Sequence, residues 1–239
     1  MQIIHLKKIN STNTYAKENI EKFSDKTIIY TDRQTAGRGR FTRKWVDLGC
    51  RNLYMTIILR PGEKFTETYS NLTQYLSLKT CKTLEEYGVI PQIRWPNDNL
   101  VNSKKISGIL SEAVFKGNTL KGIALGIGVN LNAKLEDIKA IPDRIATSLN
   151  LETGTEIDRD EFMHKLLNNF FNDYNNFLSG GFPSIKSEYI KYISGLGTEI
   201  TIQHLKEKLQ GTFDSINNDG TIKIITPKGE LNLSIGDIL

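Results

Sequence analysis

Residues 31–45 read Thr-Asp-Arg-Gln-Thr-Ala-Gly-Arg-Gly-Arg-Phe-Thr-Arg-Lys-Trp, and this stretch is the most informative part of the sequence. Gly37 and Gly39 permit backbone conformations closed to other residues and let the main chain approach a ligand closely. The arginines between and after them supply planar, permanently charged donors that suit phosphate oxygens. The composition therefore predicts a loop that wraps around phosphate. A solvated basic loop, or an arginine–glycine element that binds nucleic acid, fits it equally well.

Two further stretches place polar groups beside predicted strands. In the first, Pro96 ends a strand after Arg94-Trp95, so that Asn97 and Asp98 present an amide and a carboxylate at a turn. In the second, Lys105 leads into an apolar strand, where partial desolvation strengthens the action of its charge on a bound anion. An ordinary turn and a lysine that merely reaches solvent are the competing interpretations.

Glycines also interrupt a strand near the middle of the chain, at Gly126-Ile127-Gly128-Val129-Asn130. This segment lacks the third glycine and the following helix of a dinucleotide-binding fingerprint. Glycines within a strand are typical of places where another group approaches the backbone closely. We therefore expect them to admit a flat ligand.

Hydrophobic periodicity predicts two long helices and several strands before residue 194. The helices span residues 66–87, ending at Gly88, and residues 159–178, capped by Asp158 and closed by Gly180-Gly181. A shorter helix follows Ser11-Thr12-Asn13. Apolar runs with little alternation predict covered strands at residues 27–31, 53–59, 92–95, 106–115 and 120–131. The mixture predicts an α+β domain over residues 1–194.

The last 45 residues have a different character. Short predicted strands at residues 199–202, 208–216, 220–226 and 230–233 alternate with tight turns such as Asn218-Asp219-Gly220. Such strands bury little surface by themselves, so residues 195–239 are expected to form a small β-barrel against the main domain.

Composition excludes several specialised classes of protein. The chain has 239 residues, 38% of them hydrophobic, and a net charge of +4 that is too small to argue for nucleic acid. No apolar run approaches the roughly 20 residues of a membrane span or the core of a secretion signal, so a cytoplasmic protein is expected. Cys50 and Cys81 are expected to be reduced thiols, and the isolated histidines predict no zinc site.

Together, the order and spacing of these motifs resemble the biotin–protein ligase family along essentially the whole chain. The matching segments are Ser11-Thr12-Asn13, Gln34 to Arg40, Trp45, Asn52-Leu53-Tyr54, Trp95 to Asp98, Lys105 to Leu110, Gly126 to Asn130, Gly211, Asp219-Gly220 and Gly236-Asp237. The resemblance implies a class II synthetase-like catalytic domain with a C-terminal SH3-like barrel. It also implies an enzyme that converts biotin and ATP to biotinyl-5'-AMP and transfers biotin to a lysine.

The resemblance further implies roles for individual residues. Lys105 and Arg40 are the expected catalytic residues, with Mg²⁺ accompanying ATP and Asp98 as the better carboxylate candidate for it. Biotin is expected to contact Ser11, Thr12, Asn13, Gln34, Gly37, Arg38, Gly39, Arg40, Lys105 and Gly108. ATP is expected to contact Arg40, Arg43, Trp45, Asn97, Asp98, Lys105, Gly126, Gly128 and Asn130.

The expected acceptor is the biotin carboxyl carrier domain of a carboxylase, and an edge strand offers a way to form a homodimer. Only ten residues precede Ser11, too few for the helix-turn-helix domain of bifunctional family members, so no specific DNA binding and no membrane association are expected. The alternatives are a lipoate or octanoate ligase or transferase of the same fold, a biotin-responsive DNA-binding regulator, and an RNA-binding module.

Two features of the loop after Gly37 carry separate expectations. Val46-Asp47-Leu48-Gly49-Cys50 replaces a Ser-Pro-x-Gly element that is common in the family, which leaves the path of this segment open. Residues 37–45 contain four cations and few apolar residues, so we expect them to be mobile in the empty enzyme. Ligands would then order them and exclude water from the adenylate.

Overall fold

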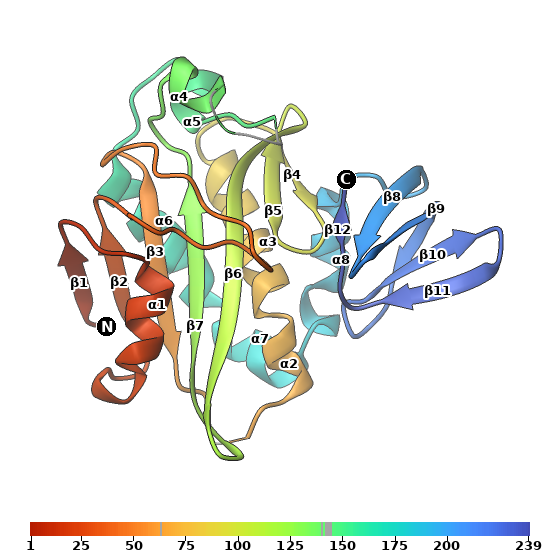
Figure 1. Ribbon diagram of the computed structural model, residues 1–239, viewed down its shortest axis with the longest axis horizontal. Coiled ribbons are helices and arrows are strands. Elements are labelled where there is room, and N and C mark those ends of the chain that lie inside the picture. The colour runs from red at the N-terminus through yellow and green to blue at the C-terminus, as the bar shows by residue number, and fades with distance from the viewer. Residues whose placement is uncertain (63, 140, 142–144) are drawn as a thin grey trace.

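The computed structural model describes residues 1–62, 64–139, 141 and 145–239. Within these residues, seven strands form the main sheet in the order β1-β2-β3-β7-β6-β5-β4 (Figure 1). The β1–β2 pair is parallel, and every other neighbouring pair is antiparallel. The strands are β1 (Ile3–Leu6), β2 (Thr27–Thr31), β3 (Leu53–Leu59), β4 (Pro91–Arg94), β5 (Asp98–Val101), β6 (Lys104–Lys116) and β7 (Thr119–Val129).

Helices cover both faces of this sheet, which explains why its central strands are apolar without alternation. Every residue of β3 is buried. One face of the sheet packs on α3 and the helices beyond it, and α1 packs on β3 and β7 over a smaller apolar cluster that includes Ile29 and Ile58. The helices are α1 (Thr12–Glu18), η1 (Ile20–Lys22), α2 (Glu67–Ser70), α3 (Leu72–Glu85), α4 (Leu135–Lys139), α5 (Leu149–Thr153), α6 (Arg159–Asn172), α7 (Tyr174–Gly180) and α8 (Pro183–Tyr192).

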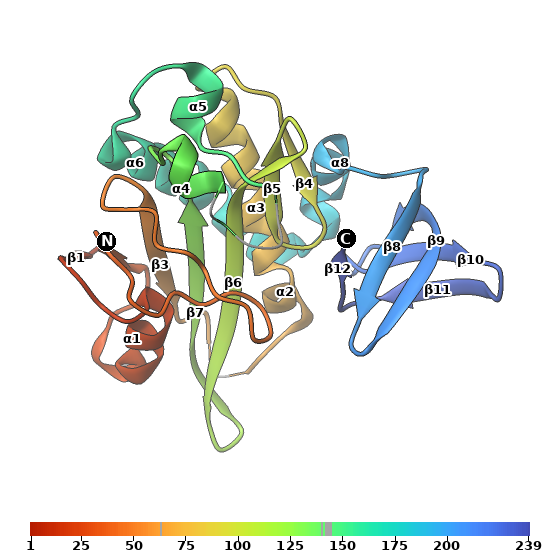
Figure 2. The ribbon, with the colours of Figure 1, turned by 45° about the horizontal axis from the view of Figure 1, so that its top comes forward.

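The C-terminal strands form a second, antiparallel sheet beside the main body, as Figures 1 and 2 show. Its order among the described residues is β11-β10-β9-β8-β12. The strands are β8 (Glu199–His204), β9 (Glu207–Ile216), β10 (Ile222–Thr226), β11 (Gly229–Leu233) and β12 (Asp237–Ile238). The predicted α+β class with a separate small β-unit is confirmed.

The turn before β10 fastens this second sheet to the main body. The carbonyl of Gly220 accepts hydrogen bonds from Trp95 Nε1 at 3.1 Å and from Gln74 Nε2 at 2.6 Å. Buried residues of the second sheet, including Phe213, belong to the same apolar core as the main domain. The expected boundary at residues 194/195 lies in the connection between α8 and β8. It stays a prediction, because the two parts share one core.

Several predicted elements need correction. The helix predicted over residues 66–87 is divided at Asn71, whose side chain donates a hydrogen bond to the carbonyl of Asp219 at 2.9 Å. The helix predicted over 159–178 is divided at Asp173, which pairs with the buried Lys79. Both breaks occur where a polar side chain serves a tertiary contact rather than the helix.

The prediction of a turn at Asn97-Asp98 is wrong for Asp98, which lies in a strand. The Trp95–Pro96 peptide is cis, and the chain reverses so that Asp98 begins β5, opposite Arg94 of β4. The sequence also gave no sign of the edge strand β1 or of α8. Both elements are short, and their polar residues interrupt the spacing of apolar residues that would indicate a strand or a helix.

Candidate active site

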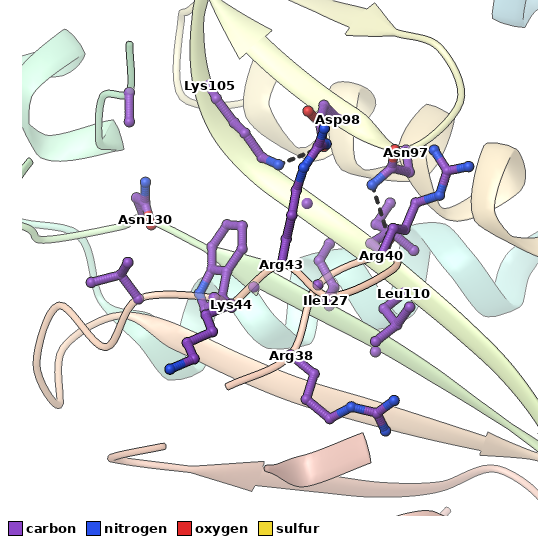
Figure 3. Close-up of a pocket in the computed structure, with 18 of the residues that line it drawn as sticks. Arg38, Arg40, Arg43, Lys44, Asn97, Asp98, Lys105, Leu110, Ile127 and Asn130 are labelled. Carbon is purple, nitrogen blue, oxygen red and sulfur yellow. Dashed lines mark hydrogen bonds and ion pairs between the residues drawn. The ribbon is translucent and has the colours of Figure 1, made fainter. Parts of the chain in front are cut away.

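A pocket of about 940 Å³ lies where residues 38–46 pass over strands β6 and β7. Figure 3 shows Arg43 of this loop extending toward Asp98 and Lys105, which begin β5 and lie near the start of β6. The second sheet contributes Asp237 to the same pocket. Sixteen of the residues predicted for ligand contacts line it: Ser11, Thr12, Asn13, Gln34, Arg38, Gly39, Arg40, Arg43, Trp45, Asn97, Asp98, Lys105, Gly108, Gly126, Gly128 and Asn130.

Two arginines of the loop share one carboxylate from the second sheet. Arg40 Nη1 lies 2.8 Å from Asp237 Oδ1, and Arg43 Nη1 lies 2.6 Å from Asp237 Oδ2. Arg40 also donates to the Asn97 side-chain oxygen at 3.2 Å. Asn97 is braced in turn by a bond from its Nδ2 to the carbonyl of Ile109. Charge-assisted bonds of this kind are short and directional, so they fix where the guanidinium groups lie.

Lys105 and Asp98 form an ion pair at the opposite wall of the pocket. The Lys105 ammonium lies 2.6 Å from Asp98 Oδ1 (Figure 3). Arg94 approaches the other oxygen at 2.9 Å. The side chains of Lys105 and Asp98 are only 17% and 5% exposed, so solvent screens this charge pair weakly. The Lys105 ammonium also lies 5.5 Å from the centroid of the Trp45 ring.

The glycines of β7 make room for side chains of this protein itself. A Cβ at Gly128 would lie 2.3 Å from the Trp45 indole, and one at Gly126 would lie 2.0 Å from the Asn13 amide oxygen. The flat group that lies against Gly128 is the indole of Trp45, and the expectation that these glycines admit a flat ligand stays a prediction.

Polar residues at the start of α1 form the other end of the pocket. The Ser11 hydroxyl caps the helix, and the Thr12 amide donates to Gln34 Oε1 at 2.8 Å. The Thr56 hydroxyl of β3 lies within hydrogen-bond distance, 2.9 Å, of the Thr12 hydroxyl. Thr12, Gln34 and Thr56 are therefore held in place by hydrogen bonds to one another.

Asn13 lines the pocket and also has several hydrogen-bond partners within the protein. Its amide NH₂ donates to Glu112 and to the carbonyl of Leu110, each at 3.1 Å. Its amide oxygen accepts from the Thr56 hydroxyl at 2.7 Å. These partners lie far from Asn13 in the sequence, and its contact with biotin stays a prediction.

A third charge cluster lies beside the pocket. Glu112 of β6 accepts from Lys17 of α1 at 2.7 Å, and Arg38 of the loop approaches the same oxygen at 3.0 Å. Burial alone would raise the pKa of Glu112, but bonds from Lys17 and Asn13 and the charge of Arg38 lower it below its usual value. Glu112 is therefore ionised at neutral pH.

The geometry does not fit a dedicated magnesium site at Asp98. Both oxygens of that carboxylate already face cations, which oppose a divalent ion, and Glu112 is paired in the same way. Across the described ranges, no group of three or more His, Cys, Asp or Glu residues could hold a metal ion. Since Mg²⁺ is commonly held by few carboxylates and by phosphate oxygens, ATP itself would supply most of its ligands.

The loop has more internal structure than its composition indicated. The Gly39 amide donates to the carbonyl of Arg43 at 2.9 Å, and the Trp45 amide to that of Gly37 at 3.0 Å. Downstream, the Asp47 carboxylate lies 2.6 Å from Arg33, and the Leu48 amide donates to the Tyr54 hydroxyl at 2.7 Å. These bonds define the path of the segment that departs from the usual family pattern.

Sequence reasoning missed several residues of this site. Asp237 was noted only as part of a Gly-Asp pair near the C-terminus, and Arg94 only as the residue before Trp95. The apolar part of the pocket wall includes Leu48, Met55 and Ile127. Nothing in their sequence positions, in or near predicted strands, indicated that they would line a pocket. Gly37 was predicted to contact biotin; it is absent from the lining, although a Cβ there would lie 2.5 Å from the Trp45 carbonyl oxygen.

Comparison with known proteins identifies the family. Residues 6–130 match the model of the biotin/lipoate A/B protein ligase family. The chain belongs to this family. It is 31% identical to the bifunctional ligase/repressor BirA of Bacillus spizizenii, over 99% of this chain and 73% of that protein. It is 30% identical to the biotin–[acetyl-CoA-carboxylase] ligase of Paracoccus denitrificans, over 94% of both chains.

The solved structures agree with this membership. A biotin protein ligase from Aquifex aeolicus, determined in complex with biotin and ATP, is 29% identical and superposes with a TM-score of 0.80, covering 100% of this chain and 97% of that one. The resemblance to biotin–protein ligases drawn from the sequence motifs is confirmed. None of the described helices combines the length and the apolar character needed to cross a membrane.

Proposed function

We propose that this protein activates biotin with ATP and transfers the biotinyl group to a lysine of a biotin carboxyl carrier domain. One observation carries the proposal. A single pocket joins the polar cluster at Ser11, Thr12 and Gln34 to the cations Arg40, Arg43 and Lys105. The first end suits a ureido ring and the second suits a carboxylate and phosphates. The ligases of known structure with biotin and ATP support the same assignment.

The reaction follows from the chemistry of the two substrates. A biotin carboxylate oxygen attacks the α-phosphorus of ATP, pyrophosphate leaves, and a mixed anhydride forms. The acceptor amine then attacks the acyl carbon, an amide bond forms, the amine loses a proton, and AMP leaves. Negative charge concentrates around the α-phosphate in both steps, so fixed cations stabilise both transition states.

The position of each residue in the pocket indicates its role in these two steps. Lys105 is held against Asp98 in a poorly hydrated wall, where its charge acts strongly on the reacting carboxylate and phosphate. Arg40 and Arg43, held in place by Asp237, donate their remaining N–H groups to phosphate oxygens. Trp45 and Asn130 flank the nucleotide. Mg²⁺ would enter with ATP and would neutralise part of the charge on its phosphates.

The test is incubation of the purified protein with ATP, Mg²⁺, biotin and an isolated carrier domain, with the carrier's mass as the readout. The expected result is a carrier heavier by one biotinyl group, only when all components are present. Parallel reactions with lipoate and octanoate separate the ligases of this fold. Modification by lipoate or octanoate but not by biotin would overturn the proposal.

A further inference from the structure

Glu112 lies outside the pocket lining but joins three elements that build the pocket. Its carboxylate, 15% exposed, accepts hydrogen bonds from Lys17 at 2.7 Å, from Asn13 at 3.1 Å and from Arg38 at 3.2 Å. Lys17 and Asn13 belong to α1, Arg38 belongs to the loop, and Glu112 itself lies on β6. A carboxylate with three donors from two segments is a junction between them.

The direction of Arg38 distinguishes it from the other cations of the loop. Figure 3 shows its side chain pointing away from Lys105 and Asp98. Its guanidinium therefore serves Glu112, while Arg38 and Gly39 still line the pocket. Since Gly39 has no side chain, main-chain atoms form the pocket wall there. Two residues earlier, Gly37 lies close to Gln34, which is at the biotin end of the pocket. A Cβ added at Gly37 would lie 3.1 Å from the Gln34 amide nitrogen.

We propose that Glu112 is a positioning residue for biotin: by holding Arg38 against β6, it fixes the main chain of residues 37–39 at the biotin end of the pocket. The inference rests on the proposed function. The loop is then anchored at two places with different consequences. Asp237 holds the arginines that phosphate must recruit, whereas Glu112 holds the one arginine that faces away from the reaction.

The arrangement requires the negative charge of Glu112 more than its shape. A glutamine has the same shape and can still accept from Asn13, so the packing under α1 is preserved. It lacks the negative charge that attracts the Arg38 guanidinium, so the ion pair is lost and a weaker bond to a neutral amide oxygen takes its place. Loss of charge should therefore release the loop and leave the sheet intact.

The experiment compares Glu112→Gln, Arg38→Gln and the double variant in biotin-dependent exchange of pyrophosphate into ATP. Each single variant should raise the KM for biotin by about tenfold, the scale of one charge-assisted bond, with kcat nearly unchanged. The KM of the double variant for biotin should be no higher than that of the more impaired single variant, because both substitutions remove the same contact. Glu112→Asp, which keeps the charge, should recover part of the loss.

Lys17→Gln is the matched control, since it removes the other cation of Glu112 without touching the loop. It should leave the KM for biotin within about twofold of wild type. Melting temperatures establish that all variants are folded. A Glu112→Gln enzyme with the wild-type KM, or additive losses in the double variant, would overturn the inference.

A second readout does not depend on catalysis. Trypsin should cleave after Arg40, Arg43 and Lys44 faster in Glu112→Gln than in Lys17→Gln, because the released loop opens more often. Equal cleavage of these two variants also overturns the inference. If wild type shows no biotin-dependent exchange, the proposed function fails, and the cleavage rates still decide whether Glu112 holds the loop.

Discussion

The guanidinium of Arg40 lies 2.8 Å from the carboxylate of Asp237, and this pair connects the first fifth of the chain to its end. Asp237 belongs to the second sheet and is 7% exposed, and it also pairs with Arg43. The second sheet therefore contributes directly to the pocket that the main domain builds. A phosphate group that enters this pocket meets two arginines already aligned by a carboxylate.

Replacement of Asp237 by Asn should weaken use of ATP more than use of biotin. The carboxylate aligns Arg40 and Arg43, and a charge-assisted bond contributes about 1.5–3 kcal/mol, so the KM for ATP should rise by about tenfold or more. Asp214→Asn is the control and should resemble wild type, because Asp214 lies in the same sheet and its contacts with Lys223 and Ser215 are exposed. Equal effects of the two substitutions would remove Asp237 from the nucleotide site.

Replacement of Lys105 by Ala should leave the fold intact and slow adenylate formation. Loss of one preorganised electrostatic donor costs roughly two to three orders of magnitude in rate. Pyrophosphate exchange measures the step directly. Lys104→Ala is the neighbouring control, because that lysine is 46% exposed and pairs with Glu152 instead. Near-normal exchange by the Lys105 variant would refute its catalytic role.

Replacement of Gly128 by Ala should displace Trp45. The new methyl group would lie 2.3 Å from the indole, a distance that no relaxation of the ring in place can accommodate. We expect a change in tryptophan fluorescence and a higher KM for ATP. With Trp45 already replaced by Ala, the same glycine substitution should cost little, because the clash is gone. Additive effects of the two changes would contradict this explanation.

The loop at residues 37–45 should become more ordered when ligands bind. Its internal hydrogen bonds are few, and most of its side chains are exposed. Amide hydrogen exchange across these residues should slow with biotin and ATP present, and Arg40→Gly should release biotinyl-adenylate faster than wild type. Unchanged exchange in the liganded enzyme, together with normal retention of adenylate by the variant, would contradict a lid.

Stability should depend on pH through Glu112. Its pKa is lowered on folding, so folding favours the ionised form. The contribution is complete above the unfolded carboxyl pKa of about 4.3 and is lost as pH falls through the lower folded value. Urea denaturation of wild type and Glu112→Gln should therefore show a stability difference at neutral pH that shrinks on acidification. A difference that does not change with pH would exclude this linkage.

The sequence by itself determined the parts of this protein whose signal is local. The runs at β2 and β3 are apolar without alternation because both faces of the sheet are covered, and their limits were predicted to the residue. The Asp158 cap and the glycines at 88 and 181 mark helix ends through backbone chemistry that acts within a few residues. The spacing of the Gly-Arg loop, Trp95 to Asp98 and Lys105 was enough to indicate the family.

Only the tertiary structure decided which of these groups serve each other. Asn13 and Glu112 are 99 positions apart, and Arg40 and Asp237 are 197 apart, yet each pair forms a hydrogen bond. No local rule relates such distant residues, because strand order and the docking of the second sheet bring them together. The same cause explains why Gly126 and Gly128 accommodate Asn13 and Trp45. A glycine within a strand indicates that another group approaches the backbone, but only the fold determines which side chain that group is.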